Sequence, residues 1–168
     1  MAVLLFTPFV SSEVETRAAT EPLGARPSTP LGTNGREDHP QAKPFGHPDR
    51  AQRDVAAALT RAAREGHRVI LVFGANWCHD SRALAGWFAT PRFRDMLAPR
   101  YEVVWIDVGK KDKNLDLARR FGLDGIAGTP TVLIVDAAGK ALNLADAPGW
   151  RNASTRTSDA IFDYFAKR

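Results

Sequence analysis

The sequence predicts one α/β domain, built on a mixed sheet of about four strands, behind an N-terminal tail. Two observations support this fold class. Residues 1–47 hold six of the eleven prolines of the 168-residue chain, whereas residues 48–168 carry most of its Val, Ile, Leu and Trp. Within the second part, short β-branched runs alternate with segments of helical periodicity. The domain is therefore expected to begin near Pro48.

The tail opens on an apolar stretch, residues 1–10, which lacks the positive flank of a signal peptide and is interrupted by Pro8. The stretch is too short to cross a membrane. Small residues at Ala18 and Ala19 fit the remnant of an export signal, so the compartment stays open between cytoplasmic and periplasmic or secreted. Residues 11–47 lack apolar periodicity and are expected to be disordered.

The first three elements of the domain are a helix, a strand and a second helix. Residues 48–65 are rich in Ala and Arg, and Gly66 suits the left-handed position that ends a helix. Residues 68–74 form a continuous apolar run, which is typical of a strand buried on both faces of a sheet. From Cys78 to Phe88 the apolar residues recur at spacings of three and four, so a helix is expected to start at Cys78.

A short helix, a strand and a longer helix follow. Pro91 suits the first position of a helix over residues 91–97. Residues 101–108 are mostly apolar and predict a strand. Asp112 is a suitable N-cap for a helix over residues 113–121.

The chain closes with a hairpin and a helix. Residues 131–135 predict a strand, residues 136–140 a turn that contains glycine, and residues 141–144 a short strand that returns antiparallel. Ser158 is expected to cap a helix that runs to the end of the chain.

Charge and the few metal-ligating residues argue against several function classes. The formal net charge is +4, and the one dense basic cluster, residues 110–113, lacks the interleaved aromatic residues of a nucleic-acid surface. The four histidines are scattered without metal-binding spacing, and the single cysteine, Cys78, cannot form an internal disulfide or a multi-thiolate metal site. We therefore expect no nucleic acid, no metal and no membrane span, and a monomeric chain.

Two motifs carry a resemblance to a known family. Trp77-Cys78 stands at a strand-to-helix turn, and Gly128-Thr129-Pro130 opens a later strand. With the order of elements, these motifs make residues 48–168 similar to the thioredoxin family. The resemblance implies a three-layer α/β/α sandwich with Cys78 as the redox-active residue, and with Trp77, Thr129 and a cis Pro130 holding an extended substrate segment. Without the resemblance, Pro130 is an ordinary proline at the start of a strand.

Three positions depart from the family pattern. Ser81 stands where the family has its second cysteine, Val72 where it often has a buried acid, and Val103 where it commonly has a lysine. The groups that serve dithiol turnover are thus missing together. The loss of the acid is consistent with the loss of the second cysteine, because a buried carboxylate destabilises a fold and has no catalytic role there without that cysteine.

The residues around Cys78 indicate which groups favour or oppose the thiolate form of its sulfur. A helix N-terminus stabilises negative charge and so favours the thiolate, which is the nucleophilic form. Ser81 is expected to add a hydroxyl donor, and a protonated His79 would favour the thiolate while Asp80 would oppose it. Asp80 and Arg82 are otherwise expected to be solvated surface residues. The alternative for Cys78 is a buried, inert core cysteine.

These observations lead to two functional hypotheses. The first is monothiol thiol–disulfide exchange, in which Cys78 forms mixed disulfides with client proteins or with glutathione as a co-substrate, so that isomerisation or deglutathionylation results. No other cofactor is expected. The second is a non-catalytic peptide-binding or chaperone module, in which the groove between Trp77 and Pro130 captures extended clients.

Overall fold

The computed structural model describes residues 39–168, which build a mixed sheet of three strands. The strands are β1 (Arg68–Gly74), β2 (Tyr101–Asp107) and β3 (Thr131–Val135), in the order β2-β1-β3. β1 runs parallel to β2 and antiparallel to β3. The predicted mixed character of the sheet is confirmed.

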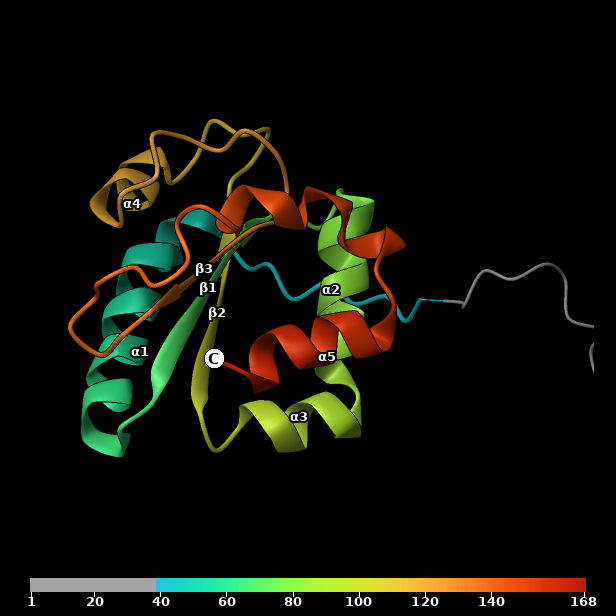
Figure 1. Cartoon of the computed structure of the whole chain (residues 1–168). Coiled ribbons are helices and arrows are strands. Elements are labelled where there is room, and N and C mark those ends of the chain that lie inside the picture. The colour runs from blue at the N-terminus through green and yellow to red at the C-terminus, as the bar shows by residue number, and fades with distance from the viewer. Residues whose placement is uncertain (1–38) are drawn as a thin grey trace, which may run out of the picture. The chain divides into compact units, whose positions relative to one another are not determined.

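Five α-helices and two short 3₁₀ helices surround this sheet within the described residues. They are η1 (Pro48–Arg50), α1 (Ala51–Glu65), α2 (His79–Ala89), α3 (Pro91–Leu97), α4 (Leu115–Arg120), η2 (Ala147–Thr155) and α5 (Ser158–Ala166). Figure 1 shows α1 on one side of the strands and α2 and α5 on the other. The three layers of an α/β/α sandwich are therefore present. None of the helices in residues 39–168 combines the length and hydropathy that a membrane crossing requires.

The central strand β1 explains why two helical layers are stable. Its side chains alternate between the faces of the sheet. Val69, Leu71 and Phe73 are fully buried in the core shared with α1 and α4. Ile70 and Val72 are fully buried in the core shared with α2, α3 and α5. A continuous apolar run thus serves both faces, as the sequence predicts for a strand covered on each side.

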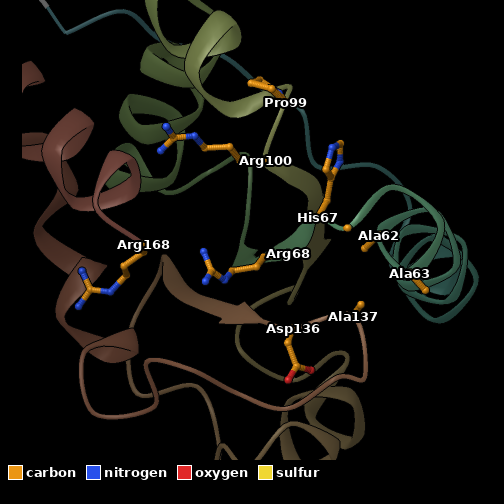
Figure 2. A pocket seen from close by; sticks show the side chains of 10 residues that line it. Ala62, Ala63, His67, Arg68, Pro99, Arg100, Asp136, Ala137 and Arg168 are labelled. Carbon is orange, nitrogen blue, oxygen red and sulfur yellow. The ribbon is translucent and has the colours of Figure 1, made fainter.

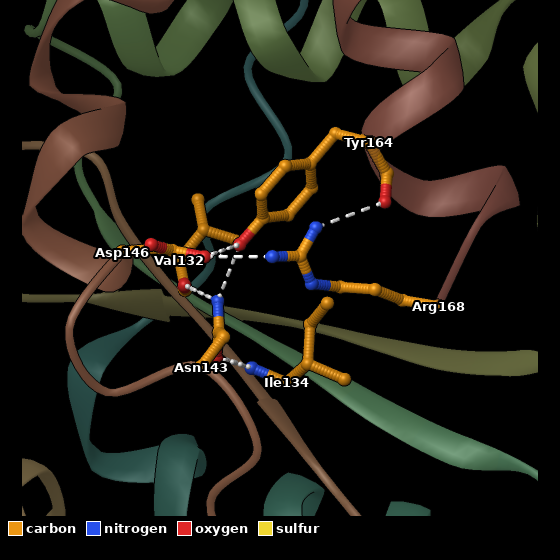
Figure 3. A network of polar contacts seen from close by, with 6 residues as sticks. All are labelled: Val132, Ile134, Asn143, Asp146, Tyr164 and Arg168. Atoms are coloured by element: carbon orange, nitrogen blue, oxygen red, sulfur yellow. Dashed lines mark hydrogen bonds and ion pairs between the residues drawn. The ribbon is translucent and has the colours of Figure 1, made fainter.

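The predicted fourth strand, residues 141–144, is reduced to a short backbone pairing followed by a side-chain contact. Only Ala141 forms a bridge, opposite Val135. Asn143 then places its carboxamide against the edge of β3: Oδ1 accepts from the Ile134 N–H (2.7 Å) and Nδ2 donates to the Val132 carbonyl (3.0 Å). Figure 3 shows this arrangement. One buried side chain therefore pairs with backbone groups that a longer strand would otherwise engage.

Two helix starts differ from the sequence predictions. Asp112 does not cap α4, because its carboxylate accepts from the Lys110 N–H instead (2.9 Å). The helix begins after Asn114, which adopts a left-handed conformation with φ of 55°. At α5 the cap is Thr157, whose hydroxyl accepts from the Ala160 N–H (3.2 Å), and Ser158 is the first helical residue.

An extended arm, residues 39–47, precedes the helices and lies against the domain. Phe45 is buried in the core beside α2, and the side chain of Asn76 pairs with its backbone N–H and carbonyl (3.2 and 2.7 Å). Pro40 lies so close to Gly86 in α2 that a side chain at position 86 would collide with it. The compact domain therefore starts before Pro48. The other predictions for the tail concern residues 1–38 and lie outside the described residues.

Candidate functional site

The candidate site lies where the ends of three strands meet. β1 and β2 are parallel and end at this edge of the sheet, and β3 begins there because it is antiparallel. The chain leaves β1 at Gly74, turns through residues 75–77 and enters α2 with Cys78 as its N-cap (φ −78°, ψ 124°). The thiol therefore lies at the N-terminus of α2, where the first amides of a helix have no partner within the helix.

The sulfur of Cys78 packs against the segment that leads into β3. Sγ lies 3.2 Å from the carbonyl oxygen of Thr129, and the bond between Thr129 and Pro130 is cis. The thiol donates its proton in this contact, so the contact belongs to the thiol and not to the thiolate. Cys78 is only 8% exposed. The structure brings Cys78, Thr129 and Pro130 together, although the cysteine is less accessible than an exposed turn would make it.

Trp77 borders the cysteine on the solvent side. Its side chain is 56% exposed, the largest exposed fraction among the bulky apolar residues of the described part of the chain. The indole N–H donates to the carbonyl of Gly109, which follows β2 (2.8 Å). The ring is thus held by one hydrogen bond, and much of its surface remains available for contact with another molecule.

Arg82 positions the loop before the cysteine, contrary to its expected role as a solvated surface residue. Its Nη1 donates to the carbonyls of Asn76 and Trp77 (3.1 Å each). Its Nε donates to Gln41 in the N-terminal arm (3.1 Å). Side chains in a helix point back toward its N-terminus. Arg82 lies one helical turn after Cys78, so its side chain is directed back toward this loop. The spacing of the two residues in the sequence could therefore have indicated the contact.

Asp80 is also tied to the fold rather than solvated. Its Oδ1 accepts from the backbone N–H and the hydroxyl of Ser154 in η2 (2.9 and 2.7 Å). These bonds hold η2 against the first turn of α2. His79 is exposed on the same turn. The two residues therefore differ in role: Asp80 links two elements, and His79 faces solvent beside the cysteine.

Ser81 stands where the family has its second cysteine, and its hydrogen bonding differs from the prediction. Its side chain is fully buried, and its Oγ has no hydrogen-bond partner among residues 39–168. The predicted bond from Ser81 to Cys78 is therefore not formed here. The hydroxyl lies beside Gly74 and the ring of Phe45, since a Cβ at position 74 would be 2.6 Å from Oγ and 2.7 Å from the ring.

The two other positions that depart from the family pattern, 72 and 103, lie in apolar surroundings. Val72 is fully buried in the core that faces α2, and Val103 is half-buried against the same core. Position 72 pairs with Trp105 and Val132 in the sheet. No ionisable side chain replaces the missing acid or lysine at either position.

Comparisons with known proteins agree with this fold. A sequence model of the thioredoxin-like family matches residues 50–137, so the chain belongs to the thioredoxin-like family. Among solved structures, it is similar to the disulphide isomerase from Xylella fastidiosa Temecula1. The two are 36% identical with a TM-score of 0.67, and the match covers 75% of this chain and 96% of that one. The search of curated proteins returned no significant match.

Proposed function

We propose that the chain is a monothiol thiol–disulfide exchange protein that uses Cys78 as its nucleophile. The observation that carries the proposal is the position of Cys78, at the N-terminus of α2 with its sulfur against the Thr129 carbonyl. Family membership and the 36% identity to a disulphide isomerase support the same class of chemistry.

The first step is attack by the Cys78 thiolate on a disulfide. The proton leaves the thiol for solvent, and the hydrogen bond to Thr129 is lost. The amides in the first turn of α2 have no partner within the helix, and they stabilise the charge of a thiolate at its N-terminus. The freed carbonyl of Thr129 becomes an acceptor for a backbone N–H of an extended client segment.

Two reactions can complete the cycle, because the 168 residues hold no second cysteine. In isomerisation, Cys78 bonds to one client sulfur and the other leaves as a thiolate. A client thiolate then attacks the mixed disulfide, which forms a new client disulfide and regenerates Cys78 with no net oxidation. In deglutathionylation, Cys78 takes the glutathionyl group and releases the client thiolate. Glutathione then removes that group as glutathione disulfide.

One observation favours the alternative of a binding module. Cys78 is nearly buried, whereas its neighbour Trp77 offers exposed aromatic surface. In a binding module the Cys78 sulfur would contribute little to client binding, and clients would be held by Trp77 and the segment before β3.

A pair of substitutions separates the two functions. We expect Cys78→Ala to abolish isomerisation of a scrambled-disulfide substrate and glutathione-dependent deglutathionylation of a model peptide. We expect Trp77→Ala to weaken client binding, since contact between client side chains and the exposed indole is lost, while Cys78 keeps its reaction with glutathione disulfide. If Cys78→Ala retains full activity in both assays, the nucleophile proposal is wrong and the binding module remains.

A further inference from the structure

A second cluster of polar side chains lies at the opposite end of the sheet from Cys78. Glu65 is the last residue of α1, His67 follows it in the turn before β1, and Glu102 is the second residue of β2. Since β1 has seven residues, the strand separates this cluster from the cysteine by about 20 Å. The cluster is therefore independent of the thiol chemistry.

The spacing of the three side chains is that of ligands around one metal ion. His67 Nδ1 lies 3.5 Å from Glu65 Oε2 and 3.7 Å from Glu102 Oε1. All three donor atoms lie within 4.8 Å of one another. Two ligand atoms bound to a tetrahedral Zn²⁺ at their usual bond lengths are about 3.4 Å apart. The side chain of Glu65 is 46% exposed and therefore has room to adjust toward this spacing.

The nitrogen at the centre of the cluster lacks a hydrogen-bond partner. His67 Nδ1 is buried and forms no hydrogen bond with any group of residues 39–168, although both carboxylates lie within ion-pair distance of it. A buried nitrogen without a partner is costly. A cation placed between Nδ1 and the two oxygens would remove this cost.

One neighbouring residue orients the cluster. Arg61 in α1 donates from Nε to Glu102 Oε2 at 2.8 Å, which leaves Oε1 directed at His67. Such a bond to the outer oxygen of a ligating carboxylate is common around metal sites. His67, Arg68 and Arg100 line one cavity of about 570 Å³, and Figure 2 shows the His67 ring directed away from the two guanidinium groups.

We propose that Glu65, His67 and Glu102 bind one divalent transition metal ion, with water in the remaining position. The set of one imidazole and two carboxylates suits Zn²⁺. The ion would connect the end of α1, the following turn and β2. Its expected effect is on stability, since a ligand that binds only the folded chain raises its melting temperature.

The test measures metal binding by the full chain carrying Cys78→Ala, which removes the thiol as a competing ligand. We expect one Zn²⁺ per chain by calorimetry and, with Co²⁺, the visible absorption of a four-coordinate ion. Zn²⁺ should also raise the melting temperature. Glu65→Gln and His67→Gln should each weaken the affinity by roughly tenfold or more, because each removes one of three protein ligands.

His47 provides a matched control. Its Nδ1 lies 3.4 Å from an Asp49 carboxylate oxygen, but within residues 39–168 this exposed pair belongs to no cluster of three metal-ligating side chains. His47→Gln should leave Zn²⁺ affinity unchanged. Because Glu65 is partly exposed at a helix C-terminus, Glu65→Gln should fold normally, and circular dichroism checks this. Failure of the chain to bind one Zn²⁺, or an affinity in Glu65→Gln and His67→Gln equal to that of the Cys78→Ala parent, would overturn the proposal.

Discussion

At the scale of single residues, Ser81 is the position that most distinguishes this site. A hydroxyl group lies fully buried next to Gly74 and Phe45 with no partner in the described part of the chain. An unsatisfied buried hydroxyl typically costs about 1–3 kcal/mol. The group therefore does not stabilise the fold, and it forms no hydrogen bond with the Cys78 sulfur.

Ser81→Ala is expected to raise the free energy of unfolding by about 1 kcal/mol, because it removes the unpartnered hydroxyl at little change in volume. Denaturant unfolding measures this. Reaction of Cys78 with glutathione disulfide should persist in the variant. Ser154→Ala is the control, since its hydroxyl does have a partner, Asp80, and its loss should destabilise the chain. A less stable Ser81→Ala chain would contradict this account of position 81.

Ser81→Cys should change how the mixed disulfide is released. A thiol one helical turn after Cys78 can attack it, so the glutathionyl adduct should give way to an internal disulfide between positions 78 and 81. Mass spectrometry distinguishes the two products, because the internal disulfide lacks the glutathionyl mass. Persistence of the adduct at the wild-type level would show that position 81 cannot reach the sulfur.

At the scale of elements, local patterns predicted most of the fold. The apolar run of β1, the spacing in α2 and the proline that begins α3 identified these elements nearly to the residue. Two features could not be predicted, because in each a polar side chain pairs with the backbone of another element. They are the pairing of Asn143 with β3 and the arm fixed by Asn76.

Asn143→Ala should lower the free energy of unfolding by about 2–4 kcal/mol, since it leaves the Ile134 N–H and the Val132 carbonyl unpaired in a buried place. Asn143→Asp keeps the acceptor for Ile134 and loses the donor to Val132. It should also destabilise the chain. Chemical unfolding of both variants gives the values, and wild-type stability in Asn143→Ala would mean that the edge of β3 needs no such partner.

At the scale of the whole molecule, Tyr101 joins the start of β2 to α5. Its hydroxyl donates to the carbonyl of Phe165 (3.0 Å) and lies 2.6 Å from that of Arg168. Burial raises the pKa of Tyr101 above its usual value of 10.0, and this effect outweighs the attraction of the nearby arginines for the phenolate. The neutral hydroxyl is thus the form that the fold favours.

The raised pKa gives a pH dependence with a definite sign. Above about pH 10 the unfolded chain loses its phenol proton before the folded chain does. The contribution of Tyr101 to stability is therefore complete below that pH and falls as the pH rises. Tyr101→Phe should be less stable at neutral pH by about 1 kcal/mol but should lose less stability above pH 10. Unfolding free energies of both chains across this range test the prediction, and parallel curves would contradict it.

The proposed function requires that the fold makes Cys78 reactive although the residue is nearly buried. The most direct measurement compares the rate at which Cys78 accepts a glutathionyl group from glutathione disulfide in the folded chain and in the chain unfolded by denaturant. Mass spectrometry follows the product, and Cys78→Ala provides the blank. We predict that the folded chain reacts faster, because the N-terminus of α2 stabilises the thiolate. A folded chain that reacts more slowly than the unfolded one would identify Cys78 as an inert core cysteine.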